Sequence, residues 1–402
     1  MKNILFVINT LGRGGAERAL ISLLSAFDSK EYNIDLFVLL GQGELIDEIP
    51  AHVHVLNKSY SHADLLSKSG KRTLNRHILA SSLKHGAALK NLPYMISNFS
   101  DQRKANALKA DKLAWKMVSD AAPRIRKEYD LAVAFIEGGS TYYVADWVNA
   151  KKKAAVLHID YKSAGYTRKL DHGAYEAFDQ LFGVSEDVVN VFTEVYPELS
   201  DRISVLPNRI DLDRIKRLSL EAPTLWKKEK SFRLLTVCRL VPQKRLEISI
   251  EAAKKMADHG LDFEWLILGE GEERTKLQRM IDEAGLTSSF VIAGVTDNPY
   301  PYYRTCDLYV HCTAFEGKSI AVQEALFAGC PVVLSDVPGN HGQITDGIDG
   351  RMVEFTPDAI ADCILKLTED EESRKSMSRV AALKKPDDSA LEKITAMVKN
   401  DE

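Results

Sequence analysis

The sequence has few cysteines and no long apolar run, and each shortage excludes a class of protein. Its 402 residues include five cysteines without paired spacing, which excludes a disulfide framework and a zinc site of the usual pattern. No stretch of the sequence approaches the roughly 18 apolar residues that span a bilayer. The N-terminal apolar run is also too short for a secretory signal. We therefore expect a reduced, cytoplasmic protein, either soluble or peripheral on the inner face of the cell membrane.

What the sequence does contain is enough apolar material for two folded cores. It is 45% hydrophobic, and its length is about twice that of an ordinary domain. The net charge of −4 identifies no partner by itself.

Short apolar runs alternate with helical patterns along the whole chain. The first run, 4–8, leads into a glycine-rich loop, a helical pattern and a second run at 34–40. Further runs lie at 131–136, 154–158, 181–184, 233–238, 265–268, 290–293, 308–311 and 331–335. Continuous apolar runs are typical of parallel strands that are buried on both faces.

This pattern predicts an α/β protein with two Rossmann-like domains that face each other across a cleft. We place the first domain at 1–205, a polar linker at 206–230 and the second domain at 231–385. The remaining segment, 386–402, is predicted to be a helix that crosses back to the first domain.

Residues 57–127 interrupt the rhythm with a strongly basic segment. It holds 15 lysines and arginines against 4 aspartates and glutamates, a net charge of +11. Apolar residues recur at helical spacing within 65–83 and 108–115. A basic amphipathic insertion fits an anionic membrane surface or a polyphosphate-bearing acceptor; equally, it fits a solvated helical face that packs on its own domain. Nucleic acid is not expected as a partner, because aromatic residues are sparse there.

Two glutamates follow the run at 308–311. Glu316 precedes a helical pattern that starts near Ile320 and ends at Gly329, and Glu324 lies two turns into it. Eight positions correspond to an offset of about 80°, so the two would not form one tight pair. The N–H groups of Gly317, Lys318 and Ser319 would lie at the positive end of this helix and could receive an anion. A glutamate near a helix N-terminus can also serve as a favourable charge alone.

Arg239 and Lys244 strengthen the functional interpretation. Arg239 directly follows the run at 233–238, and Lys244 comes five residues later. Ligands of open α/β sheets bind at the carboxyl ends of the strands. Two cations at such an end can hold a diphosphate, and arginine can do so with two parallel hydrogen bonds.

These features together resemble the family 4 retaining glycosyltransferases of the GT-B fold. The resemblance is carried by Arg239 to Lys244, Leu268-Gly269-Glu270-Gly271, Asn298-Pro299-Tyr300, Glu316 to Glu324 and Ala328 to Val333. Gly14-Gly15-Ala16-Glu17 and Pro207-Asn208-Arg209-Ile210-Asp211 extend it over nearly the whole chain outside the basic insertion.

The resemblance implies roles for individual residues of the second half. Glu316 would contact the hydroxyls of the donor sugar and Glu324 the ribose. Arg239 and Lys244 would hold the diphosphate and neutralise it as it leaves. The backbone near Gly294 and Val295 would contact the nucleotide base.

In the first half, the resemblance implies that His158 lies near the reacting sugar carbon, although a single histidine at a strand end is often structural. Gly14 and Gly15 would let the first loop approach the phosphates or the acceptor. Lys318 and Ser319 stand where the family commonly has other residues, which leaves the donor preference open.

The leading hypothesis is a retaining, metal-independent transfer of a sugar from a UDP- or GDP-sugar to a glycan or polyprenyl-linked acceptor in bacterial cell-surface polysaccharide assembly. Two alternatives are a sugar-nucleotide epimerase of the same fold and a binding protein without turnover. Gly12-x-Gly14 lacks the third glycine of a dinucleotide fingerprint. Asp211-Leu212-Asp213 precedes a helical pattern and is interpreted as a cap rather than a metal site. We expect no metal and no cofactor.

Overall fold

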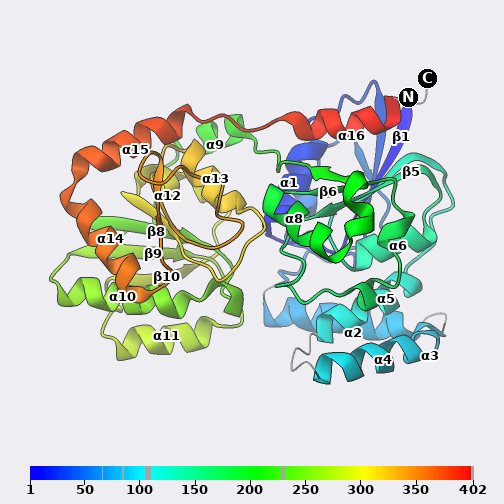
Figure 1. Ribbon diagram of the computed structural model, residues 1–402, viewed down its shortest axis with the longest axis horizontal. Coiled ribbons are helices and arrows are strands. Elements are labelled where there is room, and N and C mark those ends of the chain that lie inside the picture. Colours follow the sequence, from blue (N-terminus) through cyan, green and yellow to red (C-terminus); the bar gives the residue numbers. More distant parts are fainter. Residues whose placement is uncertain (66, 84–85, 105–109, 228–230, 400–402) are drawn as a thin grey trace. The chain divides into compact units, whose positions relative to one another are not determined.

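The computed structural model describes residues 1–65, 67–83, 86–104, 110–227 and 231–399 in two compact units (Figure 1). Unit 1 consists of Met1–Arg209 and Asp387–Glu402, and unit 2 of Ile210–Pro386. The α16 helix (Ser389–Lys399), in the C-terminal segment, thus belongs to unit 1, where the Lys393 ammonium donates to the carbonyl of Val205 at 2.6 Å. No helix in the described part of the chain is both long and apolar enough to cross a bilayer.

Unit 1 is built on a seven-stranded sheet in the order β3-β2-β1-β4-β5-β6-β7, and every pair is parallel. Its strands are β1 (Lys2–Ile8), β2 (Tyr32–Val38), β3 (Val53–Val55), β4 (Tyr129–Ala134), β5 (Ala150–Leu157), β6 (Gln180–Gly183) and β7 (Ile203–Val205). The chain builds outward from β1 in one direction and from β4 in the other, so the strand order reverses between these two neighbours. Such a switch point leaves a crevice at the carboxyl ends of both strands.

The helices of unit 1 follow its strands in the predicted alternation. They are α1 (Gly15–Leu24), α6 (Gly139–Trp147), α7 (Arg168–Asp171), α8 (Glu186–Val195), α16 and the helices of the insertion. The predicted runs at 4–8, 34–40, 131–136, 154–158 and 181–184 each coincide with a strand for most of their length. The sequence interpretation missed β3 and β7, because three-residue strands at the sheet edges give too short a pattern to recognise.

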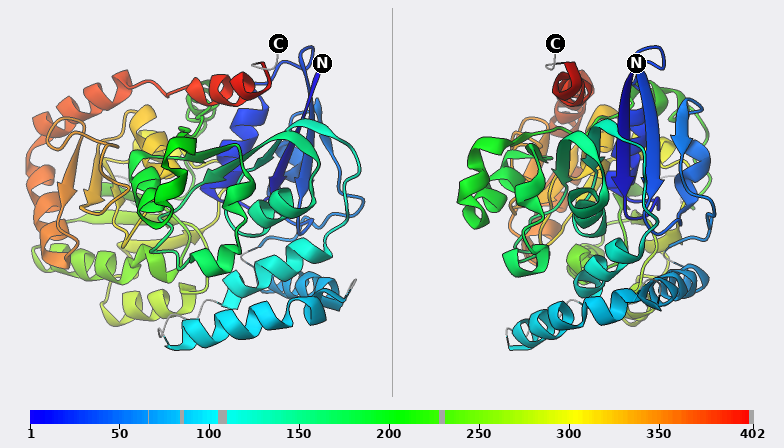
Figure 2. Two further views of the ribbon diagram at one scale, coloured as in Figure 1. Left: turned by 45° about the vertical axis from the view of Figure 1, so that its right-hand side comes forward. Right: turned by 90° about the vertical axis from the view of Figure 1, so that its right-hand side faces the viewer.

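The described residues of the basic insertion form four helices, which pack together in one group (Figures 1 and 2): α2 (Lys68–Leu83), α3 (Ala87–Lys90), α4 (Leu92–Lys104) and α5 (Ala110–Ala121). The α5 helix attaches this group to α6 and buries Leu113, Met117 and Val118. The interpretation as a face that packs on its own domain therefore holds for α5. Residues 66 and 108 of the predicted helical pattern lie outside the described residues, and α4 was not predicted.

Unit 2 repeats the architecture with a six-stranded parallel sheet in the order β10-β9-β8-β11-β12-β13. Its strands are β8 (Phe232–Val237), β9 (Phe263–Leu268), β10 (Phe290–Gly294), β11 (Leu308–His311), β12 (Val332–Ser335) and β13 (Gly350–Val353). The strand order reverses between β8 and β11. The sequence interpretation missed β13, which is only partly buried.

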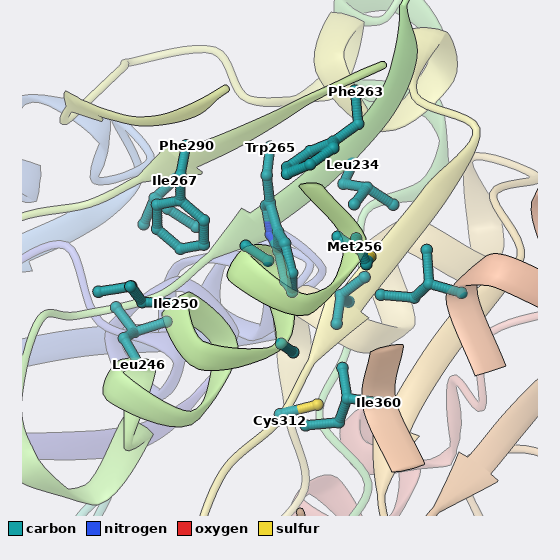
Figure 3. Close-up of a cluster of buried hydrophobic side chains, with 14 of the residues drawn as sticks. Leu234, Leu246, Ile250, Met256, Phe263, Trp265, Ile267, Phe290, Cys312 and Ile360 are labelled. Atoms are coloured by element: carbon teal, nitrogen blue, oxygen red, sulfur yellow. The ribbon is translucent and has the colours of Figure 1, made fainter. Parts of the chain in front are cut away.

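The helices of unit 2 are α9 (Leu212–Leu218), α10 (Leu246–Asp258), α11 (Arg274–Glu283), α12 (Tyr300–Thr305), α13 (Ile320–Phe327), α14 (Pro357–Glu369) and α15 (Glu371–Leu383). One face of the sheet packs Trp265 and Phe290 against Ile250 and Met256 of α10 (Figure 3). Ile360 of α14 belongs to the same cluster. These side chains are almost fully buried, so their burial is the main stabilisation of the unit.

The predicted linker at 206–230 is divided between the two units, and its residues 228–230 lie outside the described residues. Residues 206–209 belong to unit 1, and the chain from Ile210 onward belongs to unit 2. The indole of Trp226 donates to the Thr305 hydroxyl at 3.0 Å, and the Asn298 amide donates to the Leu218 carbonyl at 3.0 Å. Contacts of this kind leave no pattern in the local sequence, which is polar and charged and therefore resembles a linker.

Candidate functional site

The switch point of unit 2 brings together the residues that follow β8 and β11. Arg239 and Lys244 come after β8, and Glu316 comes after β11. The two strands are neighbours in the sheet, so segments about 70 residues apart in sequence meet at their carboxyl ends. The structure therefore places the predicted cation and carboxylate at the position where open α/β sheets bind ligands.

Lys244 and Glu316 form a buried ion pair there. The Lys244 ammonium donates to Oε1 of Glu316, and the two side chains are 11% and 12% exposed. His311, the last residue of β11, lies 3.0 Å from the same oxygen through Nε2, and its Nδ1 is 3.2 Å from the Tyr309 hydroxyl. The sequence analysis gave His311 no role, although a histidine at a strand end five residues before Glu316 was a usable signal.

The charges of this cluster are fixed by their neighbours. Burial by itself would raise the pKa of Glu316, but the Lys244 charge and the His311 hydrogen bond lower it to about 2. Burial and the adjacent Lys244 charge lower the pKa of His311. At neutral pH the cluster therefore holds an ionised Glu316 carboxylate and a neutral His311 imidazole.

One side-chain and one backbone hydrogen bond hold the two loops of the pair together. The Gln243 amide donates to the Phe315 carbonyl at 2.8 Å, and the Ala314 N–H donates to the Gln243 carbonyl at 3.0 Å. Gly339 packs so closely on the Glu316 loop that an added Cβ would lie 2.3 Å from the Glu316 carbonyl oxygen. Its φ of +86° also favours glycine. The position of Glu316 is thus set by three separate segments.

The helix after Glu316, α13, begins at Ile320, as the pattern predicted, so the three residues expected to receive an anion all precede its first turn. Ser319 is the N-cap of α13, and its hydroxyl accepts from the Val322 N–H at 3.5 Å. Gly317 and Lys318 precede the cap. Of the three N–H groups predicted to receive an anion, none therefore belongs to the first helical turn, which starts at Ile320.

Glu324 occupies a separate position on α13. Its carboxylate accepts from the Tyr300 hydroxyl at 3.0 Å and from the Tyr303 hydroxyl at 3.4 Å, both on α12. Glu316 and Glu324 thus have different partners, in agreement with the prediction that they do not pair. Two tyrosines fix the direction of the Glu324 carboxylate, which the sequence did not indicate.

The remaining predicted donor contacts of unit 2 also lie at carboxyl ends of strands. The Arg239 side chain is exposed. Gly294 ends β10 with a φ of +84° and a register shift, and its carbonyl accepts from the Gly269 N–H at 2.8 Å. Val295 follows it and is half-buried. The exposed Arg239 and the buried Lys244 therefore place two cations after the carboxyl end of β8.

In unit 1, His158 directly follows β5. Its ring packs against Phe135 with centroids 5.1 Å apart, and burial lowers its pKa to about 3. Its Nε2 is buried without a hydrogen-bond partner among the described residues. Gly14 is the N-cap of α1, and Gly15 is its first residue.

Glu137, which the sequence analysis did not single out, lies beside His158. It follows β4 at the switch point of unit 1, and it is 3% exposed. Its Oε1 accepts from the N–H groups of His158 at 2.6 Å and Ile159 at 3.0 Å. The sequence Glu137-Gly138-Gly139 after a buried strand was the signal that could have found it.

Asp211 caps α9 by accepting from the Arg214 N–H at 2.9 Å, in agreement with the prediction of a cap. Among the residues that the structure describes, no group of three or more histidine, cysteine, aspartate or glutamate side chains is placed to hold a metal ion.

Comparisons with known proteins point to one family. Residues 221–384 match the family model "Glycosyl transferases group 1". A Campylobacter jejuni protein named N-acetylgalactosamine-N,N'-diacetylbacillosaminyl-diphospho-undecaprenol 4-alpha-N-acetylgalactosaminyltransferase is 26% identical over 95% of this chain and 94% of its own length. A Bacillus subtilis poly(glycerol-phosphate) alpha-glucosyltransferase is 26% identical over 50% of this chain, which spans 29% of that relative. The chain spans 46% of an Escherichia coli galactosyltransferase that is 28% identical over the matched part.

Solved structures show the same fold. Anabaena HepE in complex with UDP and glucose has a TM-score of 0.68 at 16% identity, and the match covers 99% of both chains. TarM matches with a TM-score of 0.67 at 14% identity over 99% of both chains. The predicted α/β class with two Rossmann-like domains of the GT-B type is confirmed, and the group 1 match supports the predicted family in the second domain. The family 4 subtype stays a prediction.

Proposed function

We propose that the protein is a retaining glycosyltransferase that moves a sugar from a UDP- or GDP-sugar to a glycan or polyprenyl-linked acceptor of the bacterial cell surface. The observation that carries this proposal is the Lys244–Glu316–His311 cluster at the switch point of unit 2. Arg239, five residues before Lys244, is exposed. A nucleoside diphosphate needs cations, and the sugar and ribose need fixed hydrogen-bond acceptors. The carboxyl ends of β8 and β11 offer both.

Each residue has a defined part in the proposed reaction. Arg239 and Lys244 bind the diphosphate and neutralise the negative charge that develops as it leaves, the interaction that most stabilises such a transition state. Glu316 accepts from hydroxyls of the donor sugar, because its low pKa keeps it ionised. Glu324, held by two tyrosines, accepts from the ribose.

Side-chain cations at this position let the leaving diphosphate be neutralised without a metal, so we propose that none is required. His158 is the residue of unit 1 that we propose to contact the donor sugar. Its pKa of about 3 keeps the ring neutral, so it would act as a hydrogen-bonding group and not as a charged acid.

The first test is a thermal-shift screen with a panel of UDP- and GDP-sugars. A donor at 100 times its Kd should stabilise the protein by about 2.7 kcal/mol. With that donor, Glu316→Gln and Arg239→Ala should each reduce sugar transfer, and Lys254→Ala, an exposed cation of α10, should not. Turnover that persists unchanged in Glu316→Gln would contradict the proposal, and donor conversion without any acceptor would favour the epimerase alternative.

We further propose that the basic insertion rests on an anionic membrane surface, where a polyprenyl-linked acceptor would be found. The α2 helix carries Lys68, Lys71, Arg72 and Arg76 and no acidic residue. Several large apolar side chains of the insertion face solvent, namely Leu79, Leu89, Leu92, Ile96 and Phe99, exposed by 64%, 79%, 49%, 61% and 43%. Basic residues attract anionic lipid headgroups, and exposed apolar residues can enter the boundary of the acyl chains.

The α4 helix shows why these apolar residues point outward. Two residues hold its inner side: the Tyr94 hydroxyl donates to the Leu170 carbonyl at 2.8 Å, and Met95 packs against a small apolar cluster of the insertion. Leu92, Ile96 and Phe99 recur at spacings of four and three on the other side. The side of α4 that faces away from these contacts therefore exposes three large apolar side chains, which fits contact with lipid.

A further inference from the structure

The carboxyl ends of three neighbouring strands in unit 1 are joined by one set of side-chain hydrogen bonds. Asn9 follows β1, Glu137 follows β4 and His158 follows β5. The Asn9 amide donates to the Glu137 carbonyl at 2.9 Å, and its Oδ1 accepts from the Ser140 N–H at 2.7 Å. The Glu137 carboxylate in turn bonds to the backbone of His158. The set lies at the switch point of the sheet, where ligands of such folds bind.

Glu137 is placed unusually for a buried carboxylate, because its Oε1 is occupied by two consecutive backbone N–H groups, those of His158 and Ile159. These N–H groups belong to the turn where the chain leaves β5. A single acceptor that binds both removes most of the freedom of that turn. It thereby sets the direction in which the His158 side chain leaves the backbone.

The turn that carries Glu137 into this position depends on two glycines. Gly138 has a φ of +84°, and an added Cβ would lie 2.8 Å from the Trp115 ring. A Cβ on Gly139 would lie 2.7 Å from the same ring and 2.9 Å from Asn9 Oδ1. Close packing by α5 and by Asn9 therefore presses the Glu137 turn against the end of β5.

The His158 ring has one nitrogen available to a ligand. Its Nε2 has no partner among the described residues, so a hydrogen bond from the ring to the backbone of Phe135 would leave from Nδ1. A neutral ring that donates through Nδ1 keeps a lone pair on Nε2. This buried acceptor would be costly to leave unpaired, which indicates that a ligand hydroxyl completes it.

We propose that Glu137 is a positioning residue, which fixes the turn at His158 and Ile159 so that Nε2 of His158 accepts a hydrogen bond from a hydroxyl of the donor sugar. The proposal rests on the proposed glycosyl transfer. It assigns to a buried carboxylate of unit 1 a role that acts entirely through His158. Burial raises the pKa of Glu137, and the two N–H groups oppose that rise, so the backbone contact also helps to keep the acceptor charged.

The test is a double-mutant cycle of Glu137→Ala and His158→Ala, with kcat and the donor KM measured for each variant. If Glu137 acts through His158, each single variant should lower kcat at least tenfold, and the double variant should be no slower than His158→Ala alone. Glu137→Gln, which keeps an acceptor oxygen, should recover part of the rate. Multiplicative losses in the double variant, or a wild-type rate in Glu137→Ala, would overturn the proposal.

Asp35→Asn is the matched control for the loss of a buried carboxylate. Asp35 is 5% exposed in β2 and accepts from the Tyr129 hydroxyl at 2.7 Å. It should lower the Tm, and its effect on kcat should combine independently with that of His158→Ala. An equally strong coupling between Asp35 and His158 would mean that general destabilisation explains the result.

A measurement that needs no turnover separates this proposal from the proposed function. In the wild-type protein, NMR should show His158 neutral with the proton on Nδ1 and slow amide exchange at His158 and Ile159. Glu137→Ala should speed that exchange at least tenfold, while Asp35→Asn should not. If this holds but no donor is turned over, the proposed function fails and the positioning of His158 stands; unchanged exchange in Glu137→Ala removes the positioning role itself.

Discussion

Lys244 and Glu316, 72 residues apart in sequence, form a buried ion pair at the one point in unit 2 where the strand order reverses. The pair links the loop after β8 to the loop after β11, and His311 bonds to the same carboxylate oxygen. It therefore both stabilises the switch point and presents a cation and an acceptor to a ligand.

Removal of the Lys244 charge should destabilise the protein strongly. Lys244→Met leaves the Glu316 charge buried without its partner, which typically costs about 3–5 kcal/mol. Denaturant unfolding measures the loss. The control is Lys254→Met, which breaks the exposed Lys254–Asp258 pair and should cost at most about 1 kcal/mol. Equal losses in the two variants would contradict the description of a buried pair.

The stability that Glu316 contributes should depend on pH with a defined sign. Its pKa is about 2 in the folded protein, against the ordinary value of 4.5. A lowered folded pKa means that the contribution is complete above about pH 4.5 and disappears as the pH falls towards 2. The difference corresponds to about 3 kcal/mol. The free energy of unfolding should be larger for the wild type than for Glu316→Gln at pH 7, and this difference should become smaller below pH 4.5. A difference that does not change with pH would refute the pairing.

Gly339→Ala should lower donor turnover more than an alanine substitution at another glycine with a positive φ. The new Cβ would lie 2.3 Å from the Glu316 carbonyl oxygen, so the loop of Glu316 must move. Gly342 has a similar φ of +74° but open space around it, so Gly342→Ala should show only the left-handed strain, about 1–2 kcal/mol. Unfolding and donor turnover should be measured for both. A comparable loss of turnover in Gly342→Ala would show that backbone strain, and not the contact with Glu316, matters.

The outward face of α4 should be needed for binding to vesicles. Replacement of Leu92, Ile96 and Phe99 together by serine should abolish co-flotation with vesicles of phosphatidylglycerol and phosphatidylcholine, and high salt should weaken the wild-type binding. Leu383→Ser is the control, because Leu383 is 78% exposed but lies in α15 of unit 2. Undiminished flotation of the triple variant would exclude this face as the contact.

Local sequence patterns predicted much of the fold because buried parallel strands and amphipathic helices have recognisable periods. The strand at 308–311 and the helix from Ile320 were both found where the pattern placed them. The patterns failed where the signal was short, as in β3 and β7. The helical pattern after Asp211 was found as α9, but the contact that attaches it to unit 2, from the Asn298 amide to the Leu218 carbonyl, left no signal in the local sequence.

The sequence by itself determined the elements and the residues that end them, including Arg239, Lys244, Glu316 and His158 at the carboxyl ends of strands. Only the tertiary structure decided which of these residues meet. The Lys244–Glu316 pair depends on β8 lying next to β11, and the Glu137–His158 contact depends on β4 lying next to β5. Sheet order is a property of packing among distant segments, and no local window of sequence records it. The ionisation of Glu316, the neutral ring of His158 and the outward apolar face of α4 follow from that packing, because each depends on neighbours supplied by another part of the chain.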